Sequence, residues 1–380
     1  MLKILHVVNV AFVIPYFLGS QLSYMKKRGY DISVVCSPSA KNECYSRKYD
    51  FSYMEVPILR KFSFKADIKA IIDICRYIKA NKVDIVNGHT PKGGLLAMCA
   101  AFIMRVPKRI YFRHGLLHET AKGWKKWIFV FSERFASALA TDVVCVSPYL
   151  IERSIAEHLS PPLKMKLLNK GSCNGVDAYK QFNPQNVRND FLHDLRTKYN
   201  LPNDAWVIGY TGRLVCDKGI VELIEAFLLL KNKIEGLYLL LVGPEEERDS
   251  LPCWVKEQIN CDSRIICTGL IEEHIEYYYA MMNVLVLATH REGLGTSILE
   301  ASAMEIPILT TSYTGSRDAV IDMQTGFYID SVDTIVEKVL LLNNDIKLAN
   351  RLGKAGRSFM LRDFDQHIIW NEIEKLYYYK

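Results

Sequence analysis

Two carboxylates in the second half of the chain bracket a glycine-containing turn. Glu292 and Glu300 lie eight positions apart, and residues 293–299 between them read Gly-Leu-Gly-Thr-Ser-Ile-Leu. Glu300 stands among apolar residues, where an unpaired carboxylate is costly. A pair of ligand hydroxyls bound to Glu300 would offset that cost. The two carboxylates and the glycines between them therefore predict a ligand site.

The residues around this turn predict a strand followed by a helix. The apolar run Val284 to Leu287 is typical of a buried parallel strand, and a helical pattern continues through Met304. Thr296 or Ser297 is the expected helix cap. The amino end of such a helix offers N–H groups and a positive dipole end, which suit a phosphate.

Two cations follow another predicted strand. The strand Trp206 to Tyr210 precedes residues 211–219, Thr-Gly-Arg-Leu-Val-Cys-Asp-Lys-Gly. The forked guanidinium of Arg213 and the compact ammonium of Lys218 together suit a diphosphate. From their spacing alone, two solvated surface cations would fit equally well.

The first half of the chain places basic and imidazole side chains after two further strands. Residues 87–94 follow the strand Val83 to Val86, and residues 113–120 follow the strand Arg109 to Phe112. A lone histidine in such a position is usually structural. Here we expect five side chains to converge at the carboxyl edge of one sheet: His89, Lys92, Arg113, His114 and His118.

Apolar runs alternate with helical patterns along the whole chain, which predicts an α/β fold with parallel sheets covered on both faces. The remaining expected strands are Lys3–Val8, Asp31–Cys36, Phe51–Val56, Val143–Val146, Leu237–Val242, Arg264–Thr268, Pro307–Thr310 and Gly326–Ile329. The remaining expected helices are Phe17–Arg28, Asp67–Lys79, Leu95–Met104, Trp124–Leu139, Ile220–Lys231 and Asp365–Tyr379.

The Glu-x7-Glu stretch resembles the motif of retaining glycosyltransferases of family 4, and residues 212–219 match the Gly-Arg-Leu-x-x-x-Lys-Gly motif of that family. The resemblance covers nearly the whole chain. It implies a GT-B fold, in which two Rossmann-like domains face each other across a cleft. The implied domains are an acceptor-binding domain at 1–178, a nucleotide-sugar-binding domain at 179–362, and a C-terminal helix at 363–380 that crosses back to the first domain.

The resemblance also implies roles for individual residues. Glu292 would face the transferred sugar, Glu300 would hold the ribose, and His114 would reach the sugar and phosphate. Arg213 and Lys218 would neutralise the leaving diphosphate. The intervening donor-binding residues would be Gly293, Leu294, Gly295 and Thr296. The predicted acceptor-binding residues are His89, Lys92, Arg113 and His118.

The expected reaction is transfer of a sugar from a nucleoside-diphosphate sugar, with a UDP-sugar as the expected donor, to a hydroxyl, with retention of the anomeric configuration. The His-Thr-Pro-Lys-Gly-Gly string at residues 89–94 resembles enzymes of bacterial capsule and lipid-linked glycan assembly, which implies a lipid-linked saccharide acceptor. Two alternatives stay open, a nucleotide-sugar epimerase on the same fold and a non-catalytic partner in a polysaccharide-assembly complex.

No cofactor and no metal are expected. Asp363-Phe364-Asp365 has the Asp-x-Asp pattern of a metal site, but it lies beside a C-terminal helix rather than at a strand end. The loop Ala11 to Pro15 departs from the family, because it lacks the paired glycines that let backbone amides approach the donor. Its apolar residues would suit a lipid or a membrane surface.

Charge is unevenly distributed along the sequence. Residues 1–177 hold 27 Lys and Arg against 13 Asp and Glu, and the remainder holds 21 against 29. The basic half predicts an anionic partner, and an anionic membrane surface fits better than nucleic acid, for which no motif is present. Residues 122–131 interleave lysines with tryptophans and phenylalanines, as interfacial segments do. A helix with a buried aromatic face would give the same pattern.

Composition favours a protein that does not span the bilayer. Of the residues, 49% are hydrophobic and 24% charged, and no apolar run reaches the length of a membrane helix. The start of the chain reads as a first strand rather than a signal peptide. Cysteines such as Cys36, Cys145 and Cys267 are expected to be buried thiols in a reducing compartment. We therefore expect a cytoplasmic protein associated peripherally with the inner face of the cell membrane.

Overall fold

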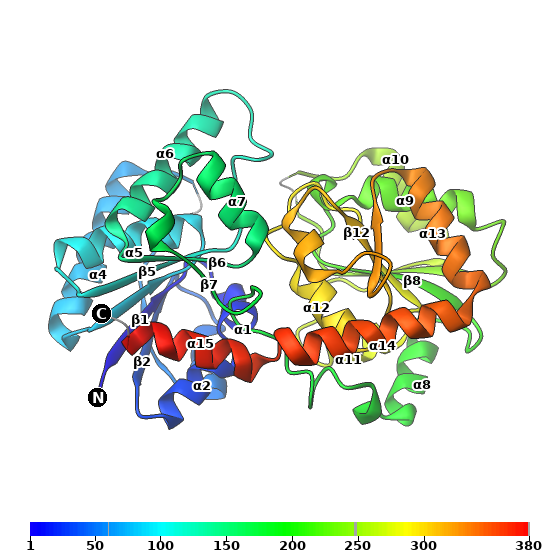
Figure 1. Ribbon diagram of the computed structural model, residues 1–380, viewed down its shortest axis with the longest axis horizontal. Helices are drawn as coiled ribbons and strands as arrows, with labels where there is room; N and C mark the ends of the chain where they lie inside the picture. The colour runs from blue at the N-terminus through cyan, green and yellow to red at the C-terminus, as the bar shows by residue number, and fades with distance from the viewer. Residues whose placement is uncertain (60, 247–248, 379–380) are drawn as a thin grey trace. The chain divides into compact units, whose positions relative to one another are not determined.

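The computed structural model describes residues 1–59, 61–246 and 249–378. These residues form two compact units (Figure 1). Unit 1 comprises Met1–Gly175 together with the C-terminal segment that begins at Gln366, and unit 2 comprises Val176–Asp365.

The described part of unit 1 holds a seven-stranded sheet in the order β3-β2-β1-β4-β5-β6-β7, and neighbouring strands pair in parallel. The order reverses direction beside β1, so the carboxyl ends of β1 and β4 flank a topological switch point, where ligands of such sheets bind. The strands are β1 Lys3–Val7, β2 Asp31–Cys36, β3 Ser52–Glu55, β4 Ile85–Gly88, β5 Lys108–Arg113, β6 Asp142–Cys145 and β7 Met165–Leu167.

Helices cover both faces of this sheet. In Figure 1, α4, α5 and α6 lie on one face and α2 and α15 lie on the other. The helices of unit 1 are α1 Ile14–Phe17, α2 Ser20–Lys27, α3 Asn42–Tyr49, α4 Phe64–Asn81, α5 Pro91–Ile103, α6 Trp124–Leu139, α7 Pro148–Ala156 and α15 Gln366–Tyr378.

Unit 2 repeats this plan with a parallel sheet that has six strands among the described residues, in the order β10-β9-β8-β11-β12-β13. The switch point here lies between β8 and β11. The strands are β8 Trp206–Thr211, β9 Leu237–Val242, β10 Ile265–Cys267, β11 Val284–Leu287, β12 Ile308–Thr311 and β13 Gly326–Ile329.

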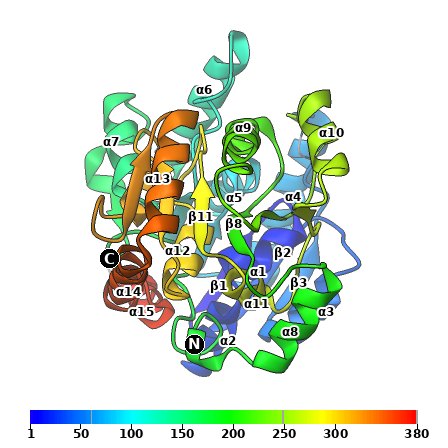
Figure 2. The ribbon, with the colours of Figure 1, turned by 90° about the vertical axis from the view of Figure 1, so that its right-hand side faces the viewer.

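In unit 2, α9, α10 and α13 cover one face of the sheet, while α12 and α14 pack together on the other (Figures 1 and 2). The predicted pair of Rossmann-like domains is confirmed. The helices of unit 2 are α8 Asn189–Lys198, α9 Ile220–Leu230, α10 Cys253–Cys261, α11 Ile275–Ala280, α12 Thr296–Ala303, α13 Val332–Asn344 and α14 Ile346–Asp363.

The C-terminal helix α15 packs on unit 1, as the family resemblance implies. Glu374 pairs with the Arg28 guanidinium at 2.8 Å, and the Trp370 indole N–H donates to Asn174 Oδ1 at 2.9 Å. Ile369 and Ile373 are buried on the same helix. The predicted helix end at Tyr379 lies outside the described residues.

Three local expectations were wrong. The predicted helix from Phe17 is interrupted at Gly19, whose φ of +46° ends α1 and lets α2 begin afresh. Strand β7 was not among the expected strands, because a three-residue edge strand gives too short a pattern to recognise. Cys36 and Cys145 are buried, but Cys267, at the end of the edge strand β10, is exposed.

Candidate active site

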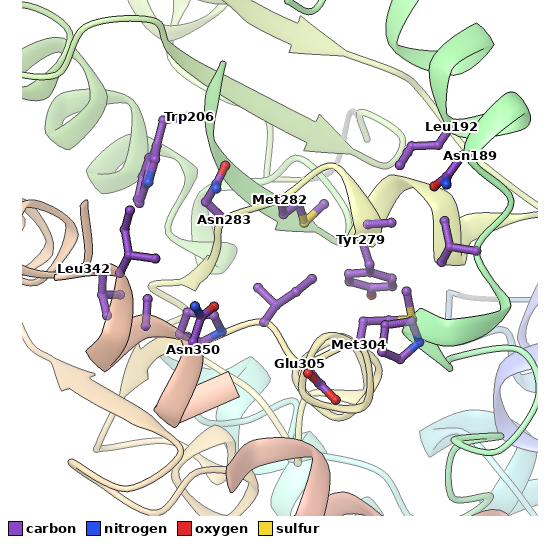
Figure 3. Close-up of a pocket in the computed structure, with 17 residues that line it drawn as sticks. Asn189, Leu192, Trp206, Tyr279, Met282, Asn283, Met304, Glu305, Leu342 and Asn350 are labelled. Carbon is purple, nitrogen blue, oxygen red and sulfur yellow. The ribbon is translucent and has the colours of Figure 1, made fainter. Parts of the chain in front are cut away.

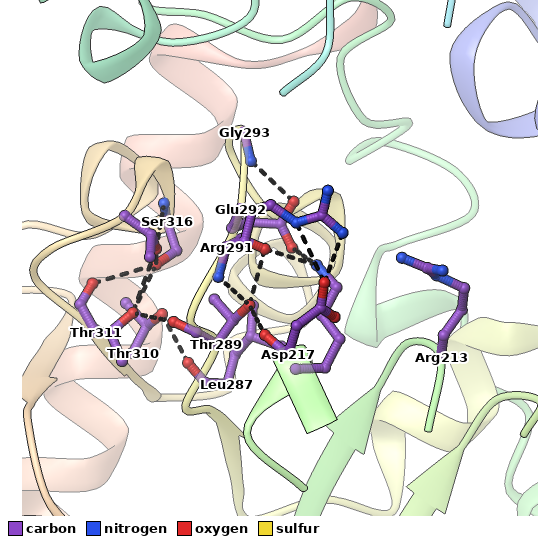
Figure 4. Close-up of polar contacts among 12 residues, drawn as sticks. Arg213, Asp217, Leu287, Thr289, Arg291, Glu292, Gly293, Thr310, Thr311 and Ser316 are labelled. Atoms are coloured by element: carbon purple, nitrogen blue, oxygen red, sulfur yellow. Dashed lines mark hydrogen bonds and ion pairs between the residues drawn. The ribbon is translucent and has the colours of Figure 1, made fainter. Parts of the chain in front are cut away.

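Glu292 lies in the loop after β11 and forms an ion pair with Lys218 from the loop after β8. The Lys218 Nζ lies 2.6 Å from Glu292 Oε2, and the Gly293 N–H donates to Glu292 Oε1 at 3.1 Å (Figure 4). The Lys218 side chain is 13% exposed and the Glu292 side chain 21%. Both are therefore reachable from solvent, and each neutralises the other in the absence of a ligand.

A second set of contacts holds this loop in place. The Arg291 Nε donates to Asp217 Oδ2 at 3.2 Å, and Thr289 Oγ1 donates to the Asp217 carbonyl at 3.2 Å (Figure 4). The Gly315 N–H donates to the Glu292 carbonyl at 3.0 Å. A Cβ at Gly315 would lie 2.1 Å from the Gly293 carbonyl oxygen, so only glycine fits there. The loop carrying Glu292 is thus supported by backbone and side-chain contacts on both sides.

Arg213 lies in the same loop as Lys218 but has a different partner. Its Nη1 is 2.8 Å from Glu246 Oε2, and the side chain is 38% exposed. The Tyr210 hydroxyl donates to the Arg213 carbonyl at 2.7 Å, which supports the loop from the buried side. The sequence pattern did not indicate Glu246 as a partner. The Arg213 side chain is therefore partly exposed at the surface. It lies away from Asp217, Arg291 and Glu292 (Figure 4).

The amino end of α12 differs from the predicted cap. The N-cap is Gly295, with a φ of +85°, and no side-chain hydrogen bond caps the helix. Thr296 is the first helical residue and Ser297 follows it, so neither acts as the cap. Uncapped N–H groups at a helix amino end favour an anion. Leu294 and Gly295 are buried, while Thr296 is exposed.

Glu300 is half-buried on α12, where the Tyr279 hydroxyl donates to its Oε2 at 2.7 Å. Desolvation raises the pKa of Glu300 to about 7, and the hydrogen bond from Tyr279 opposes this rise. Tyr279, on α11, was not predicted. A Glu with this pKa changes charge near neutral pH.

Tyr279 also lines a cavity of about 400 Å³ in unit 2, together with Trp206, Asn283 and Met304 (Figure 3). Trp206 begins β8, and Asn283 immediately precedes β11. The cavity therefore opens at the amino ends of the strands. The loops that carry Lys218 and Glu292 lie at the carboxyl ends, and we place the active site there because ligands of parallel sheets bind at that edge.

In unit 1, His89 and His114 belong to one chain of hydrogen-bonded imidazoles. His6 Nδ1 lies 3.1 Å from His89 Nε2, and His89 Nδ1 lies 3.2 Å from His114 Nε2. The Phe17 ring stacks on His114 with centroids 3.9 Å apart and an interplanar angle of 6°. His6 and Phe17 were not predicted as site residues. Phe17 ends α1, the short helix that begins within the stretch Ala11 to Pro15, which lacks paired glycines.

The other three predicted acceptor residues do not join this cluster. Arg113 is fully buried and donates to Glu133, Ser137 and Ser154 inside the domain. Its predicted contact to an acceptor conflicts with this position, because β5 extends through Arg113 and carries its side chain into the core.

The predicted acceptor contacts of Lys92 and His118 also conflict with where these side chains lie. Lys92 is 8% exposed and pairs with Asp67 at 2.7 Å. His118 is 1% exposed and pairs with Glu157. Each side chain is occupied by a partner within unit 1, so the five predicted side chains do not meet at one rim.

Helix α6 carries the predicted aromatic and basic residues on an exposed surface. Trp124, Trp127 and Phe131 are 69%, 73% and 69% exposed. The alternative of a buried aromatic face is therefore wrong for these residues. Three exposed lysines accompany them, two on α6 and Lys122 just before it. We call the six residues the α6 face: Lys122, Trp124, Lys125, Lys126, Trp127 and Phe131.

Comparison with known proteins identifies the family. Residues 193–359 match the family described as glycosyl transferases group 1, and residues 3–147 match the glycosyl transferase 4-like family. The capsular polysaccharide biosynthesis glycosyltransferase CapM of Staphylococcus aureus is 35% identical over 99% of this chain and 96% of its own length. The chain belongs to the glycosyltransferases.

A second relative of this glycosyltransferase is the Escherichia coli UDP-Gal:alpha-D-GlcNAc-diphosphoundecaprenol alpha-1,3-galactosyltransferase, 25% identical over 92% of this chain and 89% of that protein. Among solved structures, Anabaena Alr3699/HepE in complex with UDP-glucose has a TM-score of 0.81 with 17% identity, covering 99% of each chain. This likeness confirms the predicted GT-B fold. Among residues 1–59, 61–246 and 249–378, no helix has the length and apolar character to cross a membrane.

Proposed function

We propose that this glycosyltransferase moves a sugar from a UDP-sugar to a hydroxyl of a lipid-linked saccharide, with retention at the anomeric carbon, in bacterial surface polysaccharide assembly. The observation that carries the proposal is the Lys218–Glu292 pair beside the uncapped amino end of α12, with Glu300 on the same helix. The names of CapM and of the E. coli galactosyltransferase support the acceptor class, and the UDP-glucose complex of HepE supports the donor class.

The charges of unit 2 support a diphosphate leaving group. Lys218, in the loop after β8, bonds to Glu292 in the loop after β11. The amino end of α12 adds a positive dipole end. Arg213 adds a partly exposed guanidinium in the loop that carries Lys218. These groups stabilise the negative charge that develops as the diphosphate departs. We propose on this basis that transfer needs no divalent metal and no cofactor.

Glu292 is assigned to positioning the sugar and stabilising positive charge at the anomeric carbon. Its carboxylate is held by Lys218 on one oxygen and by the Gly293 N–H on the other. Donor binding lets Lys218 turn toward the phosphates, which leaves the Glu292 carboxylate free to face the sugar. The departing phosphate then assists removal of the acceptor proton on the same face, which gives retention without a carboxylate nucleophile.

The donor assignment is tested by thermal unfolding in EDTA with UDP, GDP, ADP or NAD. A ligand at 100 times its dissociation constant stabilises a protein by roughly 2.7 kcal/mol. We expect a shift with UDP that is lost in Glu300→Ala. A GDP-selective shift would change the assigned donor from a UDP-sugar to a GDP-sugar. No shift with any of the four compounds would contradict the proposed donor site.

We also propose that the α6 face binds the anionic inner surface of the cell membrane, where a lipid-linked acceptor resides. Exposed tryptophans beside lysines combine apolar insertion with attraction to anionic lipid. Co-sedimentation with phosphatidylglycerol vesicles is expected to fall in Trp124→Ala/Trp127→Ala. The control is Trp254→Ala, which removes a tryptophan that is 40% exposed on α10. If the unmodified protein bound uncharged phosphatidylcholine vesicles as well as it binds phosphatidylglycerol vesicles, the electrostatic part of the proposal would be contradicted.

A further inference from the structure

A continuous chain of hydrogen bonds runs through the switch point of unit 1 to His114. It begins at Asn87 on β4, whose Nδ2 lies 2.8 Å from the Tyr377 hydroxyl and 3.4 Å from His6 Nε2. It continues from His6 to His89 and from His89 to His114. His6 and Asn87 sit opposite each other in the β1–β4 register, so adjacent strands build the buried end of the chain.

The three imidazoles are neutral. His6 and His89 are each 1% exposed, and burial lowers the pKa of His6 to about 3 and that of His89 well below its ordinary value. Desolvation likewise lowers the pKa of His114 to about 3. A neutral imidazole carries one N–H, so each ring donates through one nitrogen and accepts through the other. A row of such rings must therefore point its hydrogen bonds in a single direction.

Asn87 decides that direction. With Nδ2 facing the Tyr377 hydroxyl and His6, both amide N–H groups have acceptors, and only Oδ1 is left buried without a partner among the described residues. Rotating the amide would place two N–H groups at that unpartnered position instead. Buried N–H groups without acceptors are rarer than under-satisfied carbonyl oxygens. Asn87 is therefore the donor to His6 Nε2.

The remaining tautomers follow from this first bond. His6 receives at Nε2 and donates from Nδ1 to His89 Nε2, and His89 then donates from Nδ1 to His114 Nε2. The proton of His114 is left on Nδ1. That ring is partly exposed, and its Nδ1 has no hydrogen-bond partner among the described residues. The stacked Phe17 and the bond from His89 together fix the ring plane and its rotation.

We propose that Asn87, His6 and His89 are positioning residues that hold His114 as an Nδ1–H tautomer, so that it offers a hydrogen-bond donor to a ligand oxygen. The ligand part rests on the proposed function, and the ligand oxygen is a phosphate or a sugar oxygen of a substrate. His114 in this tautomer does not act as a general base. His89 is accordingly part of the internal chain rather than an acceptor-binding residue, and Tyr377 connects the chain to α15.

The tautomers are tested on the full chain by two-bond ¹H–¹⁵N correlation spectra of ¹⁵N-histidine-labelled protein, with His114→Asn to assign the signals. We expect protonated Nδ1 and unprotonated Nε2 for His6, His89 and His114 without any ligand. A protonated Nε2 on His114 would overturn the proposal. The tautomers do not depend on whether UDP binds. The hydrogen-bonded chain from Asn87 to His114 and the proposed function can therefore fail separately.

Asn87→Asp reverses the first bond, because a carboxylate accepts where the amide donates. We expect all three tautomers to switch to Nε2–H and kcat to fall about a hundredfold, as when one positioned donor is lost. The matched control is Tyr377→Phe, which removes the hydroxyl but keeps the bond from Asn87 to His6. Its spectra should keep the Nδ1–H pattern. If Asn87→Asp folded with unchanged tautomers, the assigned direction would be wrong.

Adding UDP or UDP-glucose to the labelled protein identifies the ligand oxygen. A shift of the His114 Nδ1 signal with UDP indicates a phosphate oxygen, and a shift with UDP-glucose alone indicates a sugar oxygen. If UDP stabilised the protein against thermal unfolding and neither compound moved this signal, the ligand part of the proposal would be overturned. The tautomers assigned along the chain from Asn87 to His114 would be unaffected.

Discussion

In unit 2, Lys218 and Glu292 after β8 and β11 are charged and partly exposed, whereas in unit 1, His89 and His114 after β4 and β5 are neutral imidazoles packed among aromatic rings. Lys218 and Glu292 form an ion pair whose side chains are 13% and 21% exposed. His89 lies between Phe112, with ring centroids 4.5 Å apart, and the two other histidines. Both clusters lie at the switch point of a parallel sheet.

The contrast separates two ways of preparing a site. A partly buried ion pair that solvent still reaches exchanges one partner for a charged ligand, since neither charge is then left unpaired. A buried chain of neutral rings cannot exchange partners without leaving an unpaired polar atom, which is costly. Unit 2 therefore carries groups that respond to the charge of a ligand, and unit 1 carries a donor whose direction is set before a ligand binds.

The largest expected effect compares the buried arginine of unit 1 with the exposed arginine of unit 2. Arg113→Met removes the cationic partner of the buried Glu133 carboxylate, which keeps the hydrogen bond from the Tyr111 hydroxyl. Breaking such a buried pair costs about 3–5 kcal/mol of unfolding free energy. Arg213→Met breaks a pair that is 38% exposed on the arginine side, where less than about 1 kcal/mol is expected. Urea unfolding measures both values.

The double variant Arg113→Met/Glu133→Gln serves as the control, because it removes the orphaned charge and should recover part of the stability. UDP binding by the folded fraction should weaken in Arg213→Met and stay unchanged in Arg113→Met. Equal losses of stability in the two single variants would show that burial does not distinguish the two arginines.

The next effect tests the ion pair at the centre of unit 2. Glu292→Gln keeps the size of the side chain but removes the charge that we propose faces the sugar, so turnover is expected to fall about a hundredfold to a thousandfold. UDP affinity should change less, because the nucleotide is assigned to other groups. Initial rates and calorimetry on the same preparation separate the two quantities.

The control for that substitution is Glu246→Gln, which removes the partner of Arg213 and leaves Glu292 and Lys218 intact. Its turnover should stay far closer to that of the unmodified enzyme. Near-normal turnover in Glu292→Gln would refute the role assigned to Glu292.

The same contrast explains what the sequence could predict. Glu292 and Glu300 lie in one strand–turn–helix segment, so their spacing together with the preceding apolar run and the glycines between them predicted a site. The strands Val284–Leu287 and Gly326–Ile329 were predicted with their observed bounds, since buried parallel strands are continuous apolar runs.

Residues that meet only through folding left no such pattern. His6 and Asn87 are 81 positions apart, and Asn87 and Tyr377 are 290 apart, so no local spacing links them. A histidine within an apolar strand, as at position 6, was the one available signal. Arg113 was misassigned because the predicted strand ended one residue early, which turned a buried in-sheet position into a loop position.

The smallest expected effect concerns Glu300. This carboxylate lies in unit 2, beside the charged groups, but burial makes its charge depend on pH near neutrality. Its pKa of about 7 means that the carboxylate form, which we propose accepts hydrogen bonds from ligand hydroxyls, is lost as pH falls through 7. The Tyr279 hydroxyl favours the charged form, so Tyr279→Phe raises this pKa. UDP affinity should therefore begin to fall at a higher pH in the variant than in the unmodified enzyme.

Calorimetric titration with UDP from pH 6 to pH 9 measures this midpoint, and about 1 kcal/mol, or roughly fivefold in affinity, is expected near pH 7. Tyr278→Phe is the matched control, because its hydroxyl lies 3.3 Å from that of Tyr199 rather than beside Glu300. An unchanged midpoint in Tyr279→Phe would mean that Glu300 does not meet the nucleotide as a carboxylate. Glu300 would then be a neutral donor fixed before binding, as His114 is in unit 1, and the contrast between the two units would not hold at this residue.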